Sequence, residues 1–147
     1  MKKGLLGYFM RDELKLNCEK SRLSELRVFL TDVLTDAKLS DINKNQIILA
    51  VEEVCANLII HSHACNPKDS ITLDVTQDRQ KIIFEIKDSG EAFNLLEYKE
   101  PRLADVIKEK RKGGLGIILV KKIMDSIEFE SAGNQNICRL TKCLKSK

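Results

Sequence analysis

A stripe of polar residues runs through the most apolar part of the chain. Between residues 47 and 60 the polar side chains are Glu52, Glu53 and Asn57, so a helix over 46–63 would be buried on most sides. Glu53, Asn57 and His61 follow at i, i+4 spacing and would share one face of it. Because an unpaired buried carboxylate is costly, the stripe indicates an ion, a ligand or a reaction. A structural alternative stays open, in which Glu53 pairs with a distant cation and Asn57 binds neighbouring backbone.

A run of glycines leads into a second, shorter apolar segment. Gly113, Gly114 and Gly116 stand at the start of residues 115–124. Glycines at a helix start leave backbone N–H groups and the positive end of the helix dipole open to an anion, usually a phosphate. A tight turn is the alternative. The run lacks the Gly-Lys-Ser/Thr ending of a Walker A loop, and no Gly-x-Gly-x-x-Gly follows a predicted strand, so neither of those nucleotide sites is indicated.

Asp88 stands at the end of a predicted strand and is followed by Ser89 and Gly90. Its carboxylate could accept a hydrogen bond from an exocyclic amine such as adenine N6, while an aspartate that opens a turn is the alternative. Asn57 offers a neutral oxygen of the kind that Mg²⁺ prefers. Glu53, one turn earlier, could orient and deprotonate an attacking hydroxyl. The three stretches together favour one nucleotide site.

Length and composition indicate one globular domain. The chain has 147 residues, of which 43% are hydrophobic and 32% charged, as in ordinary domains with a real core. The net charge of +3 does not indicate nucleic-acid binding, and no stretch is long enough to span a membrane. A basic cluster formed by Lys108, Lys110, Arg111 and Lys112 includes Glu109 and no aromatic residue, which favours a solvated lid or a grip on triphosphate charge over nucleic-acid binding.

The cysteines and histidines give no sign of a metal site. The five cysteines show neither Cys-x-x-Cys nor a Cys/His ligand spacing. Cys18 and Cys55 lie in apolar patterns, which favours buried free thiols and a reducing, cytoplasmic environment. His61 and His63 cannot share one helical face, and further zinc ligands are missing, so a helix-end role is favoured over metal binding.

The hydrophobic periodicity predicts how these residues are positioned. Residues 1–11 lack the features of a secretory signal and are interpreted as a leader or edge segment, followed by a single domain over 12–147. Residues 94–113, charged and interrupted by Pro101, are interpreted as a nucleotide lid. The predicted elements are a strand over 13–18, helices over 21–37 and 41–61, strands over 71–75 and 82–86, a helix over 115–124, and strands over 127–130 and 136–144. This order predicts an α+β fold, a two-layer sandwich of a mostly antiparallel mixed sheet with helices on one face.

The motifs resemble those of a known superfamily. Glu53-x-x-x-Asn57, Asp88-x-Gly90 and Gly114-x-Gly116 with its following helix resemble the N, G1 and G2 boxes of the Bergerat-type ATP-binding superfamily, which includes gyrase, histidine kinases and MutL. More closely, VEEVCANLIIHSH, KDSGEAFN and KGGLGIILVKKIMDSIEFE resemble the bacterial anti-sigma-factor serine-protein kinases over about residues 12–144. The resemblance implies the histidine-kinase-like ATPase fold.

The resemblance also implies roles for particular residues. Glu53 matches the general base of the family, Asn57 its magnesium ligand and Asp88 its adenine-reading acid. Gly90 matches the glycine beneath the base, and Lys112 precedes the G2 run, where it would act on the terminal phosphate. The cofactor-binding residues implied are Asn57, Asp88, Gly90, Gly114, Leu115 and Gly116. The implied cofactors are ATP and Mg²⁺.

Function and partners follow from the same resemblance. Family members phosphorylate a serine or threonine on a STAS-type anti-anti-sigma protein, and many sequester an alternative sigma factor, usually as homodimers. The chain is therefore expected to be a cytoplasmic serine/threonine-protein kinase of a partner-switching circuit, with no direct role for nucleic acid or a membrane.

Two departures from the family pattern keep other functions open. Ala92 stands where many relatives have a second glycine, and Lys112 stands where some have an arginine, whose planar group binds phosphate through two donors. A nucleotide-gated binding module with little catalysis is therefore the alternative function. A third possibility is a stand-alone domain of a phosphorelay, which would transfer phosphate to or from aspartate or histidine.

Overall fold

The computed structural model describes residues 9–89 and 114–144, which form one sheet and a layer of helices. The first half of the chain contains β1 (Phe9–Asn17), a 3₁₀ turn (Lys20–Arg22), α1 (Leu23–Leu34), α2 (Asp41–Asn57) and a π-helical turn (Leu58–Ser62). The second half contains β2 (Ser70–Asp78), β3 (Lys81–Ser89), α4 (Gly114–Ile123), β4 (Ser126–Ala132) and β5 (Gln135–Cys143).

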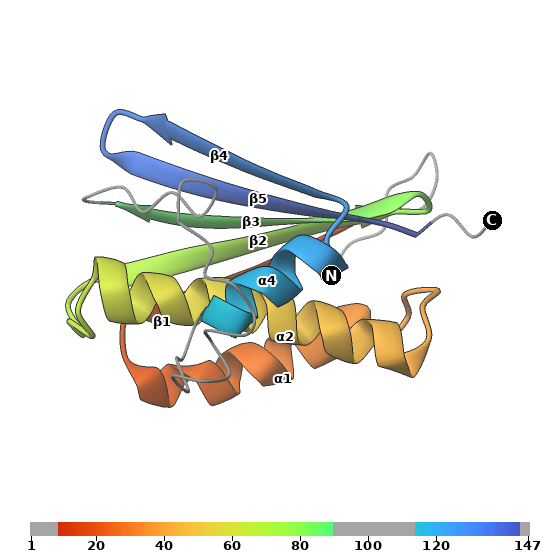
Figure 1. The fold of residues 1–147 in the computed structure, drawn as a ribbon, viewed down its shortest axis with the longest axis horizontal. Coiled ribbons are helices and arrows are strands. Elements are labelled where there is room, and N and C mark those ends of the chain that lie inside the picture. The colour runs from red at the N-terminus through yellow and green to blue at the C-terminus, as the bar shows by residue number, and fades with distance from the viewer. Residues whose placement is uncertain (1–8, 90–113, 145–147) are drawn as a thin grey trace.

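The sheet has five strands in the order β1-β2-β3-β5-β4, and every pairing among the described residues is antiparallel. Figure 1 shows α1, α2 and α4 together on one face of this sheet. The predicted α+β sandwich with helices on one face is therefore confirmed. None of the helices in the described part of the chain is long and apolar enough to cross a membrane.

The strands bury one face because their apolar residues alternate. In β3, Ile82, Phe84 and Ile86 point toward the helices and are fully buried. Phe84 pairs in register with Val75 on β2 and with Leu140 on β5, so three neighbouring strands contribute to the same core. Asp88 follows at the next position of this alternation and therefore shares the core-facing side with Phe84.

The opposite face of the sheet carries charges that neutralise each other. Asp74 Oδ2 lies 2.7 Å from Lys87 Nζ across the β2–β3 pair. Arg139 Nε on β5 donates to Glu85 Oε2 on β3 at 2.7 Å. Burial alone would raise the pKa of Asp74, but its bond to Lys87 and the charges of neighbouring residues lower it, so this carboxylate is ionised.

The central helix α2 begins where the sequence predicts. Ser40 adopts an extended conformation and its hydroxyl oxygen accepts a hydrogen bond from the backbone N–H of Asn43 at 3.1 Å. This side chain satisfies one of the N–H groups that the first turn of a helix leaves unpaired.

Replacing Ser40 by alanine is expected to lower the free energy of unfolding by about 1 kcal/mol, because the first turn of α2 loses its side-chain cap. Urea denaturation followed by circular dichroism measures the change. Ser40→Asp, which keeps an acceptor at the same position, should restore most of the loss. Equal stabilities of the alanine and aspartate variants would contradict this role.

Several predicted boundaries differ from the structure. Strand β1 begins at Phe9 instead of residue 13, because Met10 continues the inward alternation opposite Gln77. Helix α1 covers residues 23–34 instead of 21–37, since a 3₁₀ turn precedes it and its last turn is not continued. The α-helical part of α2 ends at Asn57, four residues earlier than predicted, where hydrogen bonding changes to a π-helical turn.

The cysteines of the described chain are free thiols, as predicted for Cys18 and Cys55. Both are fully buried, and Cys138 is also buried. Burial raises the pKa of the Cys18 thiol to about 11, with the nearby carboxylates of Asp69 and Asp88 acting in the same direction. These thiols are therefore neutral packing groups at physiological pH.

Candidate nucleotide site

The stripe predicted on the central helix is present over its first two members. Glu53 and Asn57 lie one turn apart in the last part of α2, and Asn57 is buried with 6% of its surface exposed. Glu52, by contrast, points toward α1, where its carboxylate accepts two hydrogen bonds from Arg27. The two adjacent glutamates therefore face different surroundings. The side chain of His61 lies outside the described residues.

Helix α4 packs against α2 and begins at Gly114. Gly114, Leu115 and Gly116 form its first turn, so the glycines lie at the helix start, where N–H groups are free of intrahelical partners. In Figure 1 the start of α4 and the C-terminal half of α2 lie toward the same end of the molecule, where β3 also ends. Gly90, Ala92, Lys112 and the lid predicted for 94–113 lie outside the described residues.

Asp88 is held on the inner face of the sheet near the end of β3. It pairs in register with Asn136 on β5, which also hydrogen bonds to its carboxylate, and 6% of its surface is exposed. Burial raises the pKa of Asp88, while its hydrogen bonds from His63 and Asn136 act in the opposite direction. A carboxylate in this environment depends on its neighbours to remain ionised.

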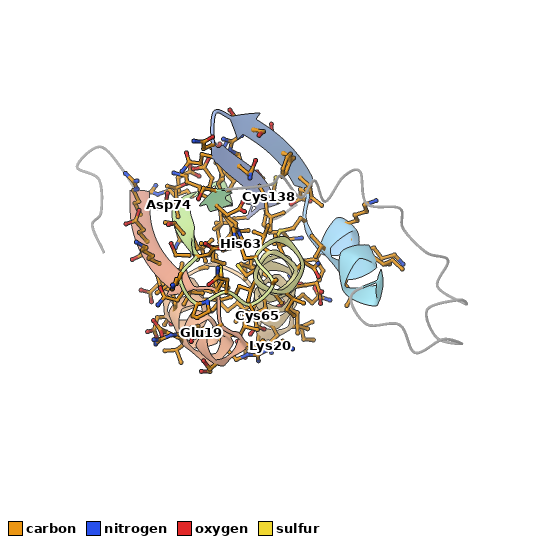
Figure 2. The ribbon with its side chains drawn as sticks, turned by 90° about the vertical axis from the view of Figure 1, so that its left-hand side faces the viewer. Glu19, Lys20, His63, Cys65, Asp74 and Cys138 are labelled. Carbon is orange, nitrogen blue, oxygen red and sulfur yellow. The ribbon has the colours of Figure 1, made fainter. Side chains whose placement is uncertain are left out.

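His63 is the principal partner of Asp88. Its Nε2 lies 2.7 Å from Asp88 Oδ2, and its Nδ1 lies 3.0 Å from Asp69 Oδ2. Figure 2 shows His63 inside the molecule, between the end of the central helix and the sheet. Burial alone would lower the pKa of His63, but the hydrogen bonds and charges of Asp88 and Asp69 outweigh it and raise the pKa above 6.5.

The backbone ties His63 to the central helix. Its N–H donates to the carbonyl oxygen of Leu58, the residue after Asn57, at 3.0 Å. Ala64 and Cys65 then adopt left-handed conformations with φ of 49° and 56°, and the chain reverses toward Asp69. Through this turn the C-terminal end of α2 is connected to Asp88 on β3 by one histidine side chain.

The raised pKa of His63 predicts a pH-dependent stability. A group whose pKa is raised by folding stabilises fully below its unfolded value, 6.5, and that contribution is lost as pH rises through the folded value. We expect the free energy of unfolding to fall by about 1.5–3 kcal/mol as pH rises through that range, the contribution of hydrogen bonds to a charged group. Urea denaturation over this range measures it, and His63→Gln should remove the dependence. The same slope in both proteins would contradict the prediction.

Asp88 also lines a hollow of about 290 Å³ at the end of the sheet, together with Ser70, Ser89, Asn134 of the β4–β5 turn and Gln135 at the start of β5. A larger hollow of about 410 Å³ lies at the opposite end of the β2–β3 hairpin, beside Asp36, Gln77 and Arg79. None of the residues predicted for the nucleotide site is among the described residues that line the larger hollow. The volume of a hollow therefore does not by itself identify the candidate nucleotide site.

Three residues of this site were missed by sequence reasoning, namely His63, Asp69 and Asn136. His63 was expected only to act at a helix end, and its ring reaches Asp88 because the chain continues past α2 through the π-helical turn. Asn136 meets Asp88 only through the register of β3 with β5, which no local pattern specifies.

Comparison with known proteins identifies the relatives of this chain. Residues 16–142 match the family model of the histidine kinase-like ATPase domain. The serine-protein kinase RsbW of Halalkalibacterium halodurans is 28% identical over 89 residues, which cover 57% of this chain and 53% of that protein. The anti-sigma F factor of Clostridium perfringens is 30% identical over 87 residues, which cover 58% of this chain and 61% of that protein. The chain thus spans about half to three fifths of the length of these relatives.

The fold is also found among solved structures. The crystal structure of the RsbU and RsbW domains of a Mycobacterium tuberculosis protein superimposes with a TM-score of 0.64. The match covers 93% of this chain and 33% of that one, at 12% sequence identity. At this identity the likeness concerns the fold, and the chemistry must be argued from the side chains described above.

Proposed function

Because the chain belongs to the histidine kinase-like ATPase domain family, we propose that it binds ATP with Mg²⁺ and transfers the terminal phosphate to a serine or threonine of a partner protein. The proposed partner is a STAS-type anti-anti-sigma protein, and the proposed regulatory output is sequestration of an alternative sigma factor by a cytoplasmic homodimer. The names of the two relatives, a serine-protein kinase and an anti-sigma factor, support this combination.

One observation carries the proposal. The end of α2 that bears Glu53 and Asn57 packs in a layer with α4, whose first turn contains Gly114 and Gly116, and is linked through His63 to Asp88. These side chains come from three separate parts of the sequence. A carboxylate, a buried amide, a glycine-bearing helix start and a base-reading carboxylate are the groups that a site for a nucleoside triphosphate needs.

The residues suit the proposed cofactor. The side-chain amide oxygen of Asn57 is a hard, neutral ligand in an otherwise apolar helix. Such an oxygen suits Mg²⁺, whose remaining ligands would be phosphate oxygens and water. When bound, Mg²⁺ would neutralise charge on the phosphates. Lys112 and the N–H groups at Gly114, Leu115 and Gly116 are proposed to hold the same phosphates, and Gly90 is proposed to lie beneath the base.

The proposed reaction is a single phosphate transfer. Glu53 accepts the proton of the serine or threonine hydroxyl, whose oxygen forms a bond to the terminal phosphorus. The bond between that phosphorus and the bridging oxygen breaks, and ADP leaves. Asp88 accepts a hydrogen bond from the exocyclic amine of adenine throughout.

The test uses purified protein, Mg²⁺ and labelled ATP in two steps. Calorimetry first measures ATP binding, and absence of heat from folded protein would overturn the proposal. Each STAS-domain protein encoded in the same genome is then offered as acceptor, and the phosphorylated residue is identified by mass spectrometry. Stable phosphate on serine or threonine is the expected result. Acid-labile or hydroxylamine-labile phosphate on histidine or aspartate would instead support a phosphorelay domain.

The second candidate function, a nucleotide-gated binding module, is favoured by Ala92 and Lys112, which depart from the family pattern. Such a module would bind its partner in an ATP-dependent way without transferring phosphate. A pure binding module should retain all its regulatory activity after Glu53→Ala, whereas a kinase that regulates by phosphate transfer should lose it.

A further inference from the structure

The contact between His63 and Asp88 places a cationic ring on the carboxylate that is proposed to read the base. Only 6% of the His63 side chain and 2% of the Asp88 side chain are exposed, so water does not separate or screen them. The second ring nitrogen faces Asp69, whose side chain is 43% exposed. One carboxylate of the triad is therefore buried at the site, and the other reaches solvent.

This geometry limits the protonation states that the ring and its two carboxylates can adopt. A neutral imidazole has one N–H and can donate to only one acceptor, whereas an imidazolium donates from both nitrogens. Nε2 lies 2.7 Å from one carboxylate oxygen and Nδ1 lies 3.0 Å from another. With both carboxylates ionised, the two contacts are satisfied only by the imidazolium. The competing state is a neutral ring that accepts an O–H from protonated Asp88, and the raised pKa of His63 favours the imidazolium over it.

The other groups around the ring do not compete for this proton near neutral pH. Burial raises the pKa of Cys18 to about 11, and burial raises that of Cys138 to about 12. Cys65 lies near Cys18, and Asn136, which bonds to Asp88, is neutral. Among the described groups that face this cluster, the ring and the two carboxylates carry its charge.

We propose that His63 is a positioning residue for base recognition, which keeps Asp88 ionised and so makes it a pure acceptor that prefers a 6-amino purine to a 6-oxo purine. The inference rests on the proposed function and adds to it a residue to which the family resemblance assigns no role. An ionised carboxylate accepts from the amine of adenine and repels the carbonyl oxygen of guanine. A protonated carboxyl group has an O–H that could donate to that carbonyl, which would relax the preference.

Removing the His63 ring takes away the positive charge beside Asp88. Without the neighbouring cation, the buried Asp88 binds a proton more readily, so its pKa rises. As pH is lowered, each protein should lose ATP binding below a limiting pH. In His63→Gln this acid limit should therefore lie about one pH unit or more above that of the natural protein. The ratio of ATP to GTP affinity at about pH 6 should fall about tenfold and should recover toward pH 8.

The experiment measures dissociation constants of Mg-ATP and Mg-GTP by calorimetry from about pH 5.5 to 8.5, on either side of the ordinary histidine pKa. Arg139→Gln is the matched control, because it removes the cation of an ion pair with a carboxylate on the opposite face of the same sheet. The nucleotide affinities of this control should depend on pH in the same way as those of the natural protein. Asp69→Asn removes one negative charge beside the ring and should move the pH at which ATP binding is lost in the same direction by a smaller amount.

A measurement on the natural protein covers the case in which His63→Gln does not fold. Nitrogen-15 chemical shifts of His63 should show two protonated ring nitrogens at about pH 6, with and without Mg-ATP. A neutral ring at about pH 6, or a His63→Gln protein with an unchanged acid limit and an unchanged ATP-to-GTP ratio, would overturn the inference while leaving ATP binding intact. Failure of the natural protein to bind ATP would instead overturn the proposed function.

Discussion

Replacing Glu53 by glutamine is expected to lower the rate of phosphate transfer by about 10²–10⁴-fold, the contribution of a positioned general base. The amide keeps the size and helix propensity of the side chain but cannot take the proton of the attacking hydroxyl. Binding of Mg-ATP should change little, because nucleotide contacts are proposed for Asn57, Asp88 and the first turn of α4 instead. Single-turnover transfer to the acceptor, measured beside calorimetric ATP binding, separates the two effects.

The chain offers a matched control for this substitution in the adjacent residue. Glu52→Gln makes the same chemical change one position earlier, but that carboxylate pairs with Arg27 on α1. The Arg27 side chain is 57% exposed, so the pair contributes little to stability and nothing to the proposed chemistry. Transfer by Glu52→Gln should stay within about threefold of the natural rate. Full transfer by Glu53→Gln would remove the base assignment. Absence of transfer by the natural protein, together with partner binding that needs ATP, would favour the nucleotide-gated binding module.

The fold could be predicted from sequence to the extent that its patterns are local. Alternation of Ile82, Phe84 and Ile86 predicts β3, and Asp88 stands where this strand ends. The helical spacing of Glu53 and Asn57 likewise required only the helix itself. The start of this helix is also a local feature, because the Ser40 cap depends on residues within one turn.

The site could be predicted less completely because its contacts are non-local. His63 reaches Asp88 across 25 positions of sequence, and Asp69 completes the triad from the segment before β2. The change from α- to π-helical hydrogen bonding after Asn57 depends on how the helix end meets the sheet. A pattern that assumes a continuous α-helix to His61 therefore places the following residues wrongly and conceals the role of His63.

Replacing Asp88 by asparagine is expected to have two large effects. ATP affinity should fall about 10–100-fold, because the buried acceptor for the exocyclic amine loses its charge and an amide N–H₂ can face either the base or His63. The free energy of unfolding should fall by about 3–5 kcal/mol, because the His63 imidazolium remains buried without its closest counter-ion. Calorimetry and urea denaturation measure the two quantities on the same preparation.

The two effects can be separated with a second buried carboxylate. Asp74 on β2 is 3% exposed, as buried as Asp88, and is bound by Lys87 on the opposite face of the sheet. Asp74→Asn should therefore destabilise the fold without weakening ATP binding, and an equal loss of affinity in both variants would show that Asp88 acts through folding alone. If Asp88 and His63 act as one unit, the affinity losses of Asp88→Asn and His63→Gln should be strongly non-additive in the double variant. Additive losses would mean that the ring and the carboxylate contribute separately, so His63 would no longer be the group that keeps Asp88 an acceptor.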